Sequence, residues 1–192
     1  MEAIDLLTNR RSTLVRKMSD PGPSEAELNQ ILTAGLRVPD HGKLGPWRIQ
    51  VLHSQGQKAL GDVLAKLFTE EHGERARDRM VENERERPQR APVLLVVTSD
   101  IHIDTTIPEM EQRMSGGALC MNLLNASHAL GYGAQWLTEW PAFDVQVKAA
   151  LGHDADTDII GFIYIGTSTE PPKDRERASI ETVVSEWTGP AA

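Results

Sequence analysis

The residues best suited to chemistry near the start of the chain are Arg10, Arg11 and Ser12, which directly follow a short apolar segment. Guanidinium groups suit phosphate oxygens because their planar fork donates paired hydrogen bonds, each worth about 1.5–3 kcal/mol when charge-assisted. Alternatively, the arginines form a solvated basic cluster that closes a helix, where the helix dipole favours positive charge. From these three residues alone, both interpretations stay open.

A second stretch with reactive side chains covers residues 37–47, with the sequence RVPDHGKLGPW. It combines turn-forming glycines and prolines with the titratable His41, a lysine and Trp47. Loops of this composition often carry binding residues, because the surrounding scaffold can aim them. We therefore predict a binding loop here, with Trp47 acting in packing and not in catalysis.

Several common catalytic and binding motifs are absent from the sequence. It has neither standard nucleotide-binding glycine motif, no HExxH, no calcium-binding loop and no GxSxG. The histidines are scattered and Cys120 is the single cysteine, so we predict no metal site and no disulfide. Because Cys120 lies in an apolar segment, we expect a buried, inert thiol. A chain without an evident proton-transfer pair is suited to a cofactor that carries the reaction itself.

Composition narrows the range of partners and compartments. The formal net charge of −8 argues against nucleic acid or an anionic membrane as a general partner. The N-terminal sequence MEAID lacks the basic and apolar regions of a signal peptide, and one cysteine suits a reducing compartment, so we expect a cytoplasmic protein.

The segment 114–130 is the longest nearly uncharged part of the chain, and its apolar residues lie all around a helical wheel. It is too short and too polar to span a membrane. A helix that is apolar on most sides must be covered on most sides, so we predict a central helix packed by its own domain and by a second subunit.

Hydrophobic periodicity predicts the other elements. We expect helices over 2–9, from a capping box at Ser24–Glu27, over 60–68 and from Pro141 to Gly152, and strands over 48–53, 92–98, 133–138 and 158–167. The densely charged continuation at 70–90 is expected to be a solvated helix or a mobile excursion. Residues 1–192 are predicted to form a single α+β or α/β layered domain with a central sheet, in which the tail 168–192 ends in an apolar arm.

Five blocks, in order along essentially the whole chain, are similar to the nitroreductase family, in particular to the compact bacterial branch of NAD(P)H nitroreductases. The blocks are NRRS at 9–12, RVPDH…GPW at 37–47, Glu111 with MSGG at 114–117, GYGAQWLT at 131–138 and GFIYIGT at 161–167. One departure is notable: Lys43 and Gly45 stand where broader family members carry amide side chains that touch the flavin.

The resemblance implies a nitroreductase-like α+β fold, with a central mixed sheet flanked by helices and a homodimer that exchanges arms. It implies FMN at the subunit interface, NAD(P)H as co-substrate and a nitroaromatic, quinone or related small-molecule electron acceptor. The tail 168–192 would dock on the partner subunit. Two alternatives remain: a flavoprotein of this fold with a different physiological reaction, and a non-catalytic FMN-binding protein.

The same resemblance implies the binding residues, with no side chain required as a catalytic acid or base and no metal. Arg10, Arg11 and Ser12 would hold the FMN phosphate and ribityl oxygens, and Arg37 and His41 would reach FMN from the partner subunit. The segment Trp136, Leu137 and Thr138 would line the flavin ring, although Trp136 could instead be a core residue. Ala126 falls where the nicotinamide nucleotide is expected, or is a packing residue. Lys173, Arg175 and Arg177 could add positive charge at the phosphate or lie in a solvated loop.

Overall fold

The computed structural model describes residues 2–190, and its elements follow the predicted order. The helices are α1 (Ala3–Asn9), α2 (Glu25–Gly35), α3 (Ser54–His72), α4 (Asp78–Glu86), α5 (Glu109–Ala129), α6 (Val145–Ala150) and α7 (Ile180–Val183). The strands are β1 (Met18–Ser19), β2 (Trp47–Leu52), β3 (Val93–Ser99), β4 (Gly133–Leu137) and β5 (Asp158–Ser168). Strand β1 is only two residues long and gave no periodic signal in the sequence.

Strand β5 is the centre of the sheet, as its apolar character on both faces predicted. It pairs with β3, β4 and β1, and β2 pairs with β3. Every pairing among the described residues is antiparallel, so the prediction of a mixed sheet is wrong for these strands. Helix α5 connects β3 to β4, and these two strands run in the same direction. They do not pair with each other, because β5 lies between them and is antiparallel to both.

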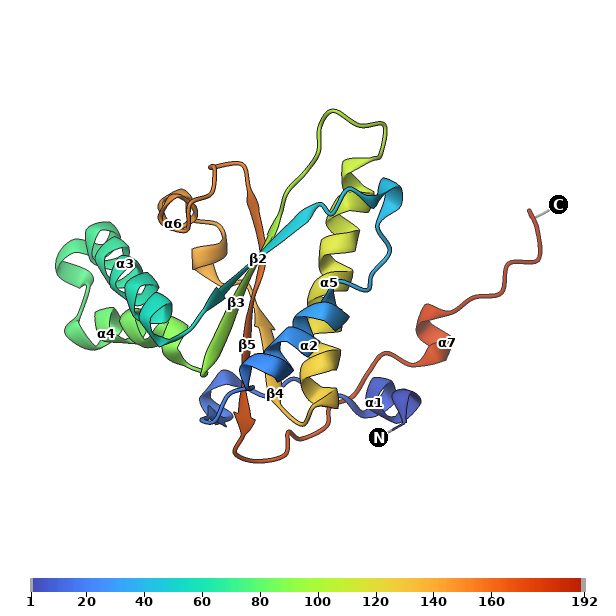
Figure 1. Ribbon diagram of the computed structural model, residues 1–192, viewed down its shortest axis with the longest axis horizontal. Coiled ribbons are helices and arrows are strands. Elements are labelled where there is room, and N and C mark those ends of the chain that lie inside the picture. The colour runs from blue at the N-terminus through green and yellow to red at the C-terminus, as the bar shows by residue number, and fades with distance from the viewer. Residues whose placement is uncertain (1, 191–192) are drawn as a thin grey trace.

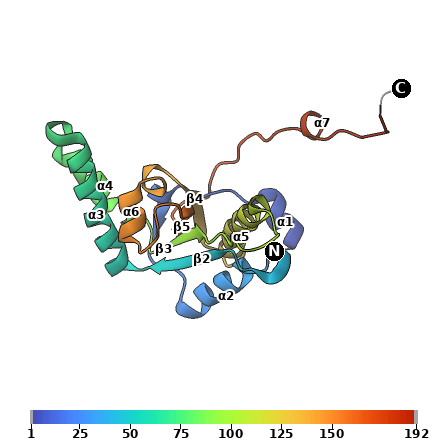
Figure 2. The same cartoon turned by 90° about the horizontal axis from the view of Figure 1, so that it is seen from above.

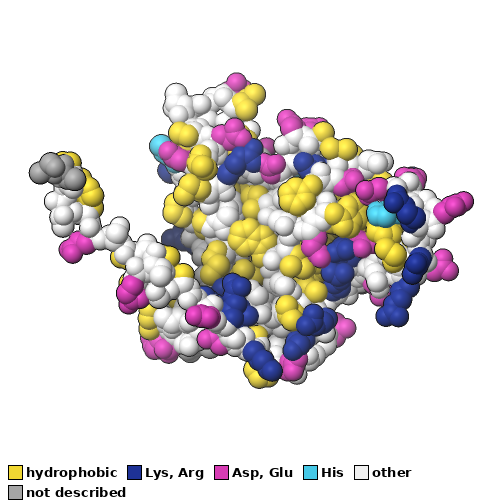
Figure 3. Space-filling model, turned by 180° about the vertical axis from the view of Figure 1, so that it is seen from behind, with side chains coloured by type: hydrophobic (Ala, Val, Ile, Leu, Met, Phe, Trp, Pro, Cys, Tyr) yellow, Lys and Arg dark blue, Asp and Glu magenta, His cyan; other side chains and the backbone are white. Residues whose placement is uncertain are grey.

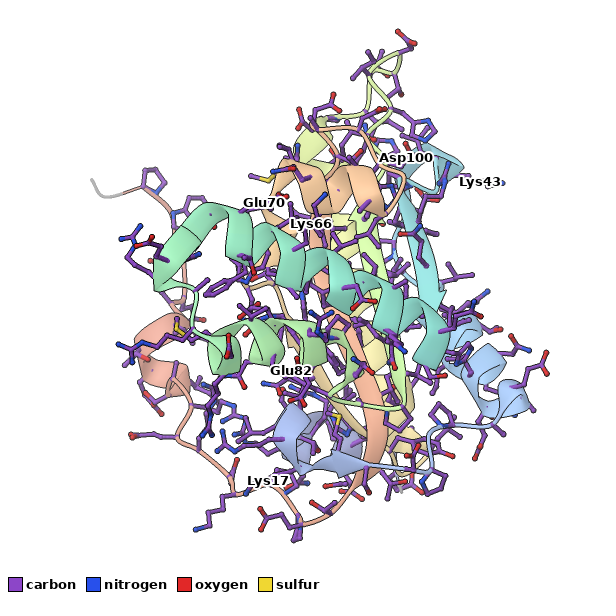
Figure 4. All side chains as sticks on the ribbon, turned by 90° about the vertical axis from the view of Figure 1, so that its left-hand side faces the viewer. Lys17, Lys43, Lys66, Glu70, Glu82 and Asp100 are labelled. Atoms are coloured by element: carbon purple, nitrogen blue, oxygen red, sulfur yellow. The ribbon has the colours of Figure 1, made fainter. Side chains whose placement is uncertain are left out.

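Helices cover both faces of the sheet, and the antiparallel pairing of the described strands agrees with the predicted α+β class. Figure 1 shows α2 and α5 on one side and α3, α4 and α6 on the other. One core cluster joins Leu28 and Ile31 of α2 to Leu119 and Leu123 of α5 and the sheet. A second cluster joins α3 and α6 to the opposite face of the same strands. Figure 4 shows α3, with Lys66 and Glu70, beside α4, with Glu82.

Local capping explains where two helices begin. Ser24 Oγ accepts a hydrogen bond from the Glu27 amide at 3.3 Å, and the Glu27 carboxylate accepts one from the Ser24 amide at 2.9 Å. This is the predicted capping box of α2. The helix predicted from Pro141 is not continuous, because the Asp144 carboxylate caps the amides of Gln146 and Val147 and starts α6 there.

The central helix α5 buries Leu119, Cys120 and Leu123 completely, but leaves Met110 and Met114 exposed. Burial raises the pKa of the Cys120 thiol to about 12, in agreement with an inert thiol. Among the described residues, no helix is long and apolar enough to cross a membrane.

The tail leaves the body of the molecule after β5, as Figures 2 and 3 show from two directions. Its apolar side chains are exposed in this chain, with Ile180 72% and Trp187 82% accessible. Residues 191–192 of the predicted tail lie outside the described residues. The tail therefore carries an uncovered apolar surface within one chain.

Candidate functional site

A hollow of about 370 Å³ lies between α1, the end of α5 and the segment after β5. We call it the arginine hollow. Its lining comprises Asp5, Leu6, Asn9, Arg10, Arg11, Thr13, His128, Gly131, Tyr132, Gly133 and residues 168–172. The structure thus brings together the N-terminal arginines and the end of the central helix, which are more than a hundred residues apart in sequence.

Backbone contacts with β4 fix the segment that carries the arginines. Helix α1 ends at Asn9, and the Arg10 amide still donates to the Leu6 carbonyl at 2.9 Å. The Thr13 amide donates to the Ala134 carbonyl at 3.1 Å, and the Val15 amide donates to Gln135 Oε1 at 2.7 Å. Arg10 is therefore held on a short, doubly anchored stretch.

The arginine hollow brings the guanidinium groups of Arg10 and Arg11 together. Burial, followed by repulsion from Arg11 and Arg177, lowers the pKa of the Arg10 guanidinium. Its Nη1 atom is buried and has no hydrogen-bond partner among the described residues. Such an atom is costly to leave unpaired, and an anion in the hollow would satisfy it.

His128 is a site residue that the sequence analysis missed. Its Nδ1 lies 2.9 Å from the Tyr132 carbonyl, so this nitrogen carries the proton, while Nε2 is buried without a partner among the described residues. Burial lowers the pKa of His128, the Tyr132 carbonyl opposes that shift, and Arg10 lowers the pKa further. The one available signal was a histidine near the end of an otherwise apolar helix.

The other two residues of the predicted phosphate motif take different positions. Arg11 lines the hollow, and its Nε donates to the Lys173 carbonyl at 3.0 Å, which ties the start of the tail to the site. Ser12 is half-buried and is not among the lining residues.

A second hollow, of about 300 Å³, lies against α5 and contains His41. His41 Nδ1 and Glu111 Oε2 are 2.8 Å apart. Ser115 Oγ donates to the Pro39 carbonyl at 2.6 Å and accepts from Trp47 Nε1 at 3.1 Å. The predicted binding loop is therefore fastened to the central helix, and Trp47 does act in packing.

Arg37 is at the start of the same loop. Its carbonyl accepts a hydrogen bond from Asn122 Nδ2 at 3.0 Å, while the residue is largely exposed. Lys43 lies in a turn closed by Asp40, whose carboxylate accepts from the amides of Leu44 and Gly45 at 3.1 and 2.9 Å. Arg37 and His41 are thus on a different surface from the arginine hollow within one chain.

Trp136 uses its side chain to join two strands. Its Nε1 donates to the Ile160 carbonyl at 3.0 Å, and its indole lies where a Cβ on Gly161 would be. A register shift between Val97 and Thr98 leaves Ile160 without a partner on β3, which frees that carbonyl. The half-buried Trp136 packs against the core cluster under α5.

The remaining predicted positions are also half-buried. Leu137 packs against the core cluster on the α3 side, and Thr138 follows the end of β4. The segment 136–138 lines neither of the two hollows. Ala126 packs against the core cluster under α5.

Glu139, directly after this segment, has an unusual backbone conformation, with φ 51° and ψ −178°. This region is essentially restricted to glycine and costs another residue on the order of 1–3 kcal/mol. Arg87 Nη1 lies 2.6 Å from Glu139 Oε2, and Arg90 Nη1 lies 3.5 Å from the same oxygen. Two arginines therefore hold a strained residue.

Arg87 also forms hydrogen bonds with residues other than Glu139. It donates twice to the Glu84 carboxylate, at 2.7 and 2.6 Å, and Glu84 also accepts from Trp140 Nε1 at 2.8 Å. The Tyr164 hydroxyl donates to the Arg87 carbonyl at 3.1 Å. The Arg87 and Glu84 side chains are only 12% and 10% exposed, so the prediction of a solvated 70–90 segment is wrong for its last part.

Burial alone would lower the pKa of Arg87 and raise that of Glu84. The hydrogen bonds to Glu84 and Glu139 outweigh burial and raise the pKa of Arg87. Those from Arg87 and Trp140 likewise lower the pKa of Glu84. Both groups are therefore charged at neutral pH.

Comparisons with known proteins agree with the resemblance noted in the sequence. The nitroreductase family profile matches residues 7–167. The "Putative NAD(P)H nitroreductase YdjA" of Escherichia coli K12 is 34% identical over 171 residues, covering 87% of this chain and 88% of that protein.

Two solved structures share the fold. A nitroreductase-like family protein from Bacillus cereus has a TM-score of 0.85 at 22% identity, covering 98% of this chain and 97% of its own. The "putative nitroreductase in complex with fmn" from Desulfovibrio desulfuricans has a TM-score of 0.73 at 24% identity, covering 97% of both chains. With a profile match over most of its length and a relative at 34% identity, the chain belongs to the nitroreductase family.

Proposed function

We propose that this protein is an FMN-dependent NAD(P)H oxidoreductase that reduces nitroaromatic, quinone or related acceptors. Family membership supports the reaction class. The observation that supports FMN as the cofactor is the arginine hollow, which Arg10 and Arg11 both line. The Arg10 Nη1 atom is buried there and has no hydrogen-bond partner among the described residues. A phosphate group fits this charge and this donor.

In this proposal the chain's own residues bind and orient. Arg10, Arg11 and Ser12 hold the phosphate and ribityl end of FMN, with His128 as a further contact in the arginine hollow. The Trp136–Thr138 segment lies along the flavin ring, and Ala126 lies toward the nicotinamide nucleotide. FMN, when bound, supplies hydride acceptance and donation at its N5 atom, so no side chain has to act as acid or base. Donor and acceptor that use one open face in turn give ping-pong kinetics.

We further propose that residues 1–192 form one domain that works as a cytoplasmic homodimer. Exposed apolar side chains on α1 and α5 and in the tail support an interface, among them Ile4, Met114 and Trp187. In such a dimer Arg37 and His41 would reach FMN from the partner subunit, because within one chain they lie apart from the arginine hollow.

The visible absorption spectrum of the purified protein tests the proposal, followed by anaerobic addition of NADPH and, separately, NADH. A flavin spectrum that bleaches, and that recovers when a nitroaromatic or quinone is added, is the expected result. A flavin spectrum that neither nicotinamide bleaches would contradict the nicotinamide step. A colourless protein that takes up no added FMN would contradict the cofactor assignment itself.

A further inference from the structure

The group around Glu139 has no role in the function proposed above. It comprises Glu139 in its glycine-like conformation, Arg87 and Arg90 against its carboxylate, and Glu84 behind Arg87. The arginines come from the end of the charged 70–90 segment, whereas Glu139 directly follows β4. Two distant parts of the chain therefore meet where the proposed flavin-lining segment ends.

Strain of this kind persists only where the surroundings enforce it, and it concentrates at functional sites. Here the surroundings can be identified. Each residue of the Glu84–Arg87–Glu139 chain is bonded to the next at 2.6–2.7 Å, and Trp140 and Tyr164 add hydrogen bonds at 2.8 and 3.1 Å. The low exposure of Arg87 and Glu84 reduces solvent screening of this network.

We propose that Arg87 and Arg90 are positioning residues for the flavin. By holding the Glu139 carboxylate, they fix the backbone of Leu137–Glu139 in the conformation that receives the edge of the ring. This inference rests on the proposed function, because it needs FMN to lie along Trp136–Thr138. It gives the charged segment a task that its composition does not suggest.

Glycine at position 139 supplies the critical test, since glycine adopts this backbone conformation without strain. The Glu139→Gly protein should bind FMN within about threefold of the wild type. Glycine adopts this backbone conformation without strain, so the arginines are no longer needed to enforce it. Arg87→Gln should weaken FMN binding about tenfold and shift the midpoint potential of the bound flavin. In the double variant, the Arg87→Gln change should have less than about a twofold further effect.

Two further variants make the result specific. Arg90→Gln removes an ion pair with Glu139 and leaves the Arg87–Glu84 pair in place, so it tests the same idea if Arg87→Gln folds poorly. Arg85→Gln is the matched control, because Arg85 pairs with Asp62 and Glu82 on the outer side of the same segment. It should leave FMN affinity and potential unchanged.

The readouts are FMN affinity by fluorescence titration of the apoprotein, the flavin midpoint potential, and the unfolding temperature of the apoprotein. Equal effects of Arg87→Gln in the wild-type and Glu139→Gly proteins would overturn the proposal. Coupling between the two positions in unfolding but not in FMN affinity would also overturn it, by showing a structural pair only. If the wild type itself takes up no FMN, the proposed function fails first, and the unfolding cycle still measures the pair.

Discussion

At the scale of single residues, the residues that line the arginine hollow include two with a buried nitrogen atom that has no hydrogen-bond partner among the described residues. These atoms are Arg10 Nη1 and His128 Nε2. One belongs to a permanent cation and the other to an imidazole whose pKa is lowered by burial. Both line the hollow in which we propose the FMN phosphate. They differ in what each would contribute: Arg10 provides affinity, and His128 makes the site sensitive to pH.

Arg10→Ala should weaken FMN binding about tenfold to a hundredfold, because it removes charge-assisted hydrogen bonds to the phosphate. Riboflavin, which lacks the phosphate, should bind the wild type and the variant alike. Fluorescence titration with both flavins measures this difference. Arg16→Ala is the control, since Arg16 is exposed and is not a lining residue of the hollow. Unchanged FMN affinity in Arg10→Ala would refute the phosphate assignment.

His128 should make the stability of the apoprotein depend on pH. Its pKa in the folded protein lies below the ordinary value of about 6.5, so below neutral pH the unfolded chain binds more protons than the folded one. The contribution of His128 to stability is therefore complete above about pH 6.5 and is lost as pH falls. Unfolding midpoints measured from pH 8 to pH 5 should drop less in His128→Gln than in the wild type. Parallel curves would show that His128 does not titrate in this way.

At the scale of elements, α5 acts as the support for the rest of the site. It buries its apolar side in the core, fastens the 37–47 loop through Ser115 and Asn122, and presents His128 at its end. Its composition predicted an apolar helix. Its polar side chains turn out to be the ones that locate the binding loop.

Ser115→Ala should destabilise the protein by about 1–3 kcal/mol, because the Pro39 carbonyl and Trp47 Nε1 both lose their partner. Ser127→Ala is a matched control: Ser127 is buried on the same helix, but bonds to the Leu123 carbonyl within it. Hydrogen exchange should rise in the 37–47 loop for Ser115→Ala and stay unchanged there for Ser127→Ala. Equal exchange in the two variants would mean that Ser115 does not hold the loop.

At the scale of the whole molecule, the described chain leaves apolar surface uncovered on α1, α5 and the tail. Figure 3 shows the tail extended away from the body, where its side chains contact little of their own chain. A surface of this kind is typical of a subunit interface. The homodimer that we propose would cover it.

Sedimentation equilibrium should give twice the chain mass of 21.2 kDa for the wild type. Met114→Asp should weaken association about tenfold or more, because it would bury an unpaired charge in the interface. Met80→Asp is the control, since Met80 is also exposed but lies on α4, on the other side of the sheet. A monomeric wild type, or equal effects of the two substitutions, would contradict the dimer.

The sequence by itself determined a layered domain of helices around a central sheet, the central strand β5, the central helix α5 and the capping of α2. These depend on local periodicity and on short-range hydrogen bonds, which residue types a few positions apart encode. It also identified the family, and the resemblance predicted Arg10 and Arg11 as phosphate ligands, an assignment that stays a prediction. The arginines are meaningful in the sequence because nitroreductase motifs follow them in order.

Tertiary structure alone decided the antiparallel pairing of the strands, the burial of charged residues at the end of the 70–90 segment, and which residues come together in each site. Which strands meet depends on how helices return the chain, and this has no local signature. Arg87 and Glu84 look like solvated charges in sequence, because nothing nearby shows that Glu139, about fifty residues later, will reach them. His128 likewise joins Arg10 only once α5 packs beside α1. Long-range packing therefore decides which charged and titratable groups are buried together.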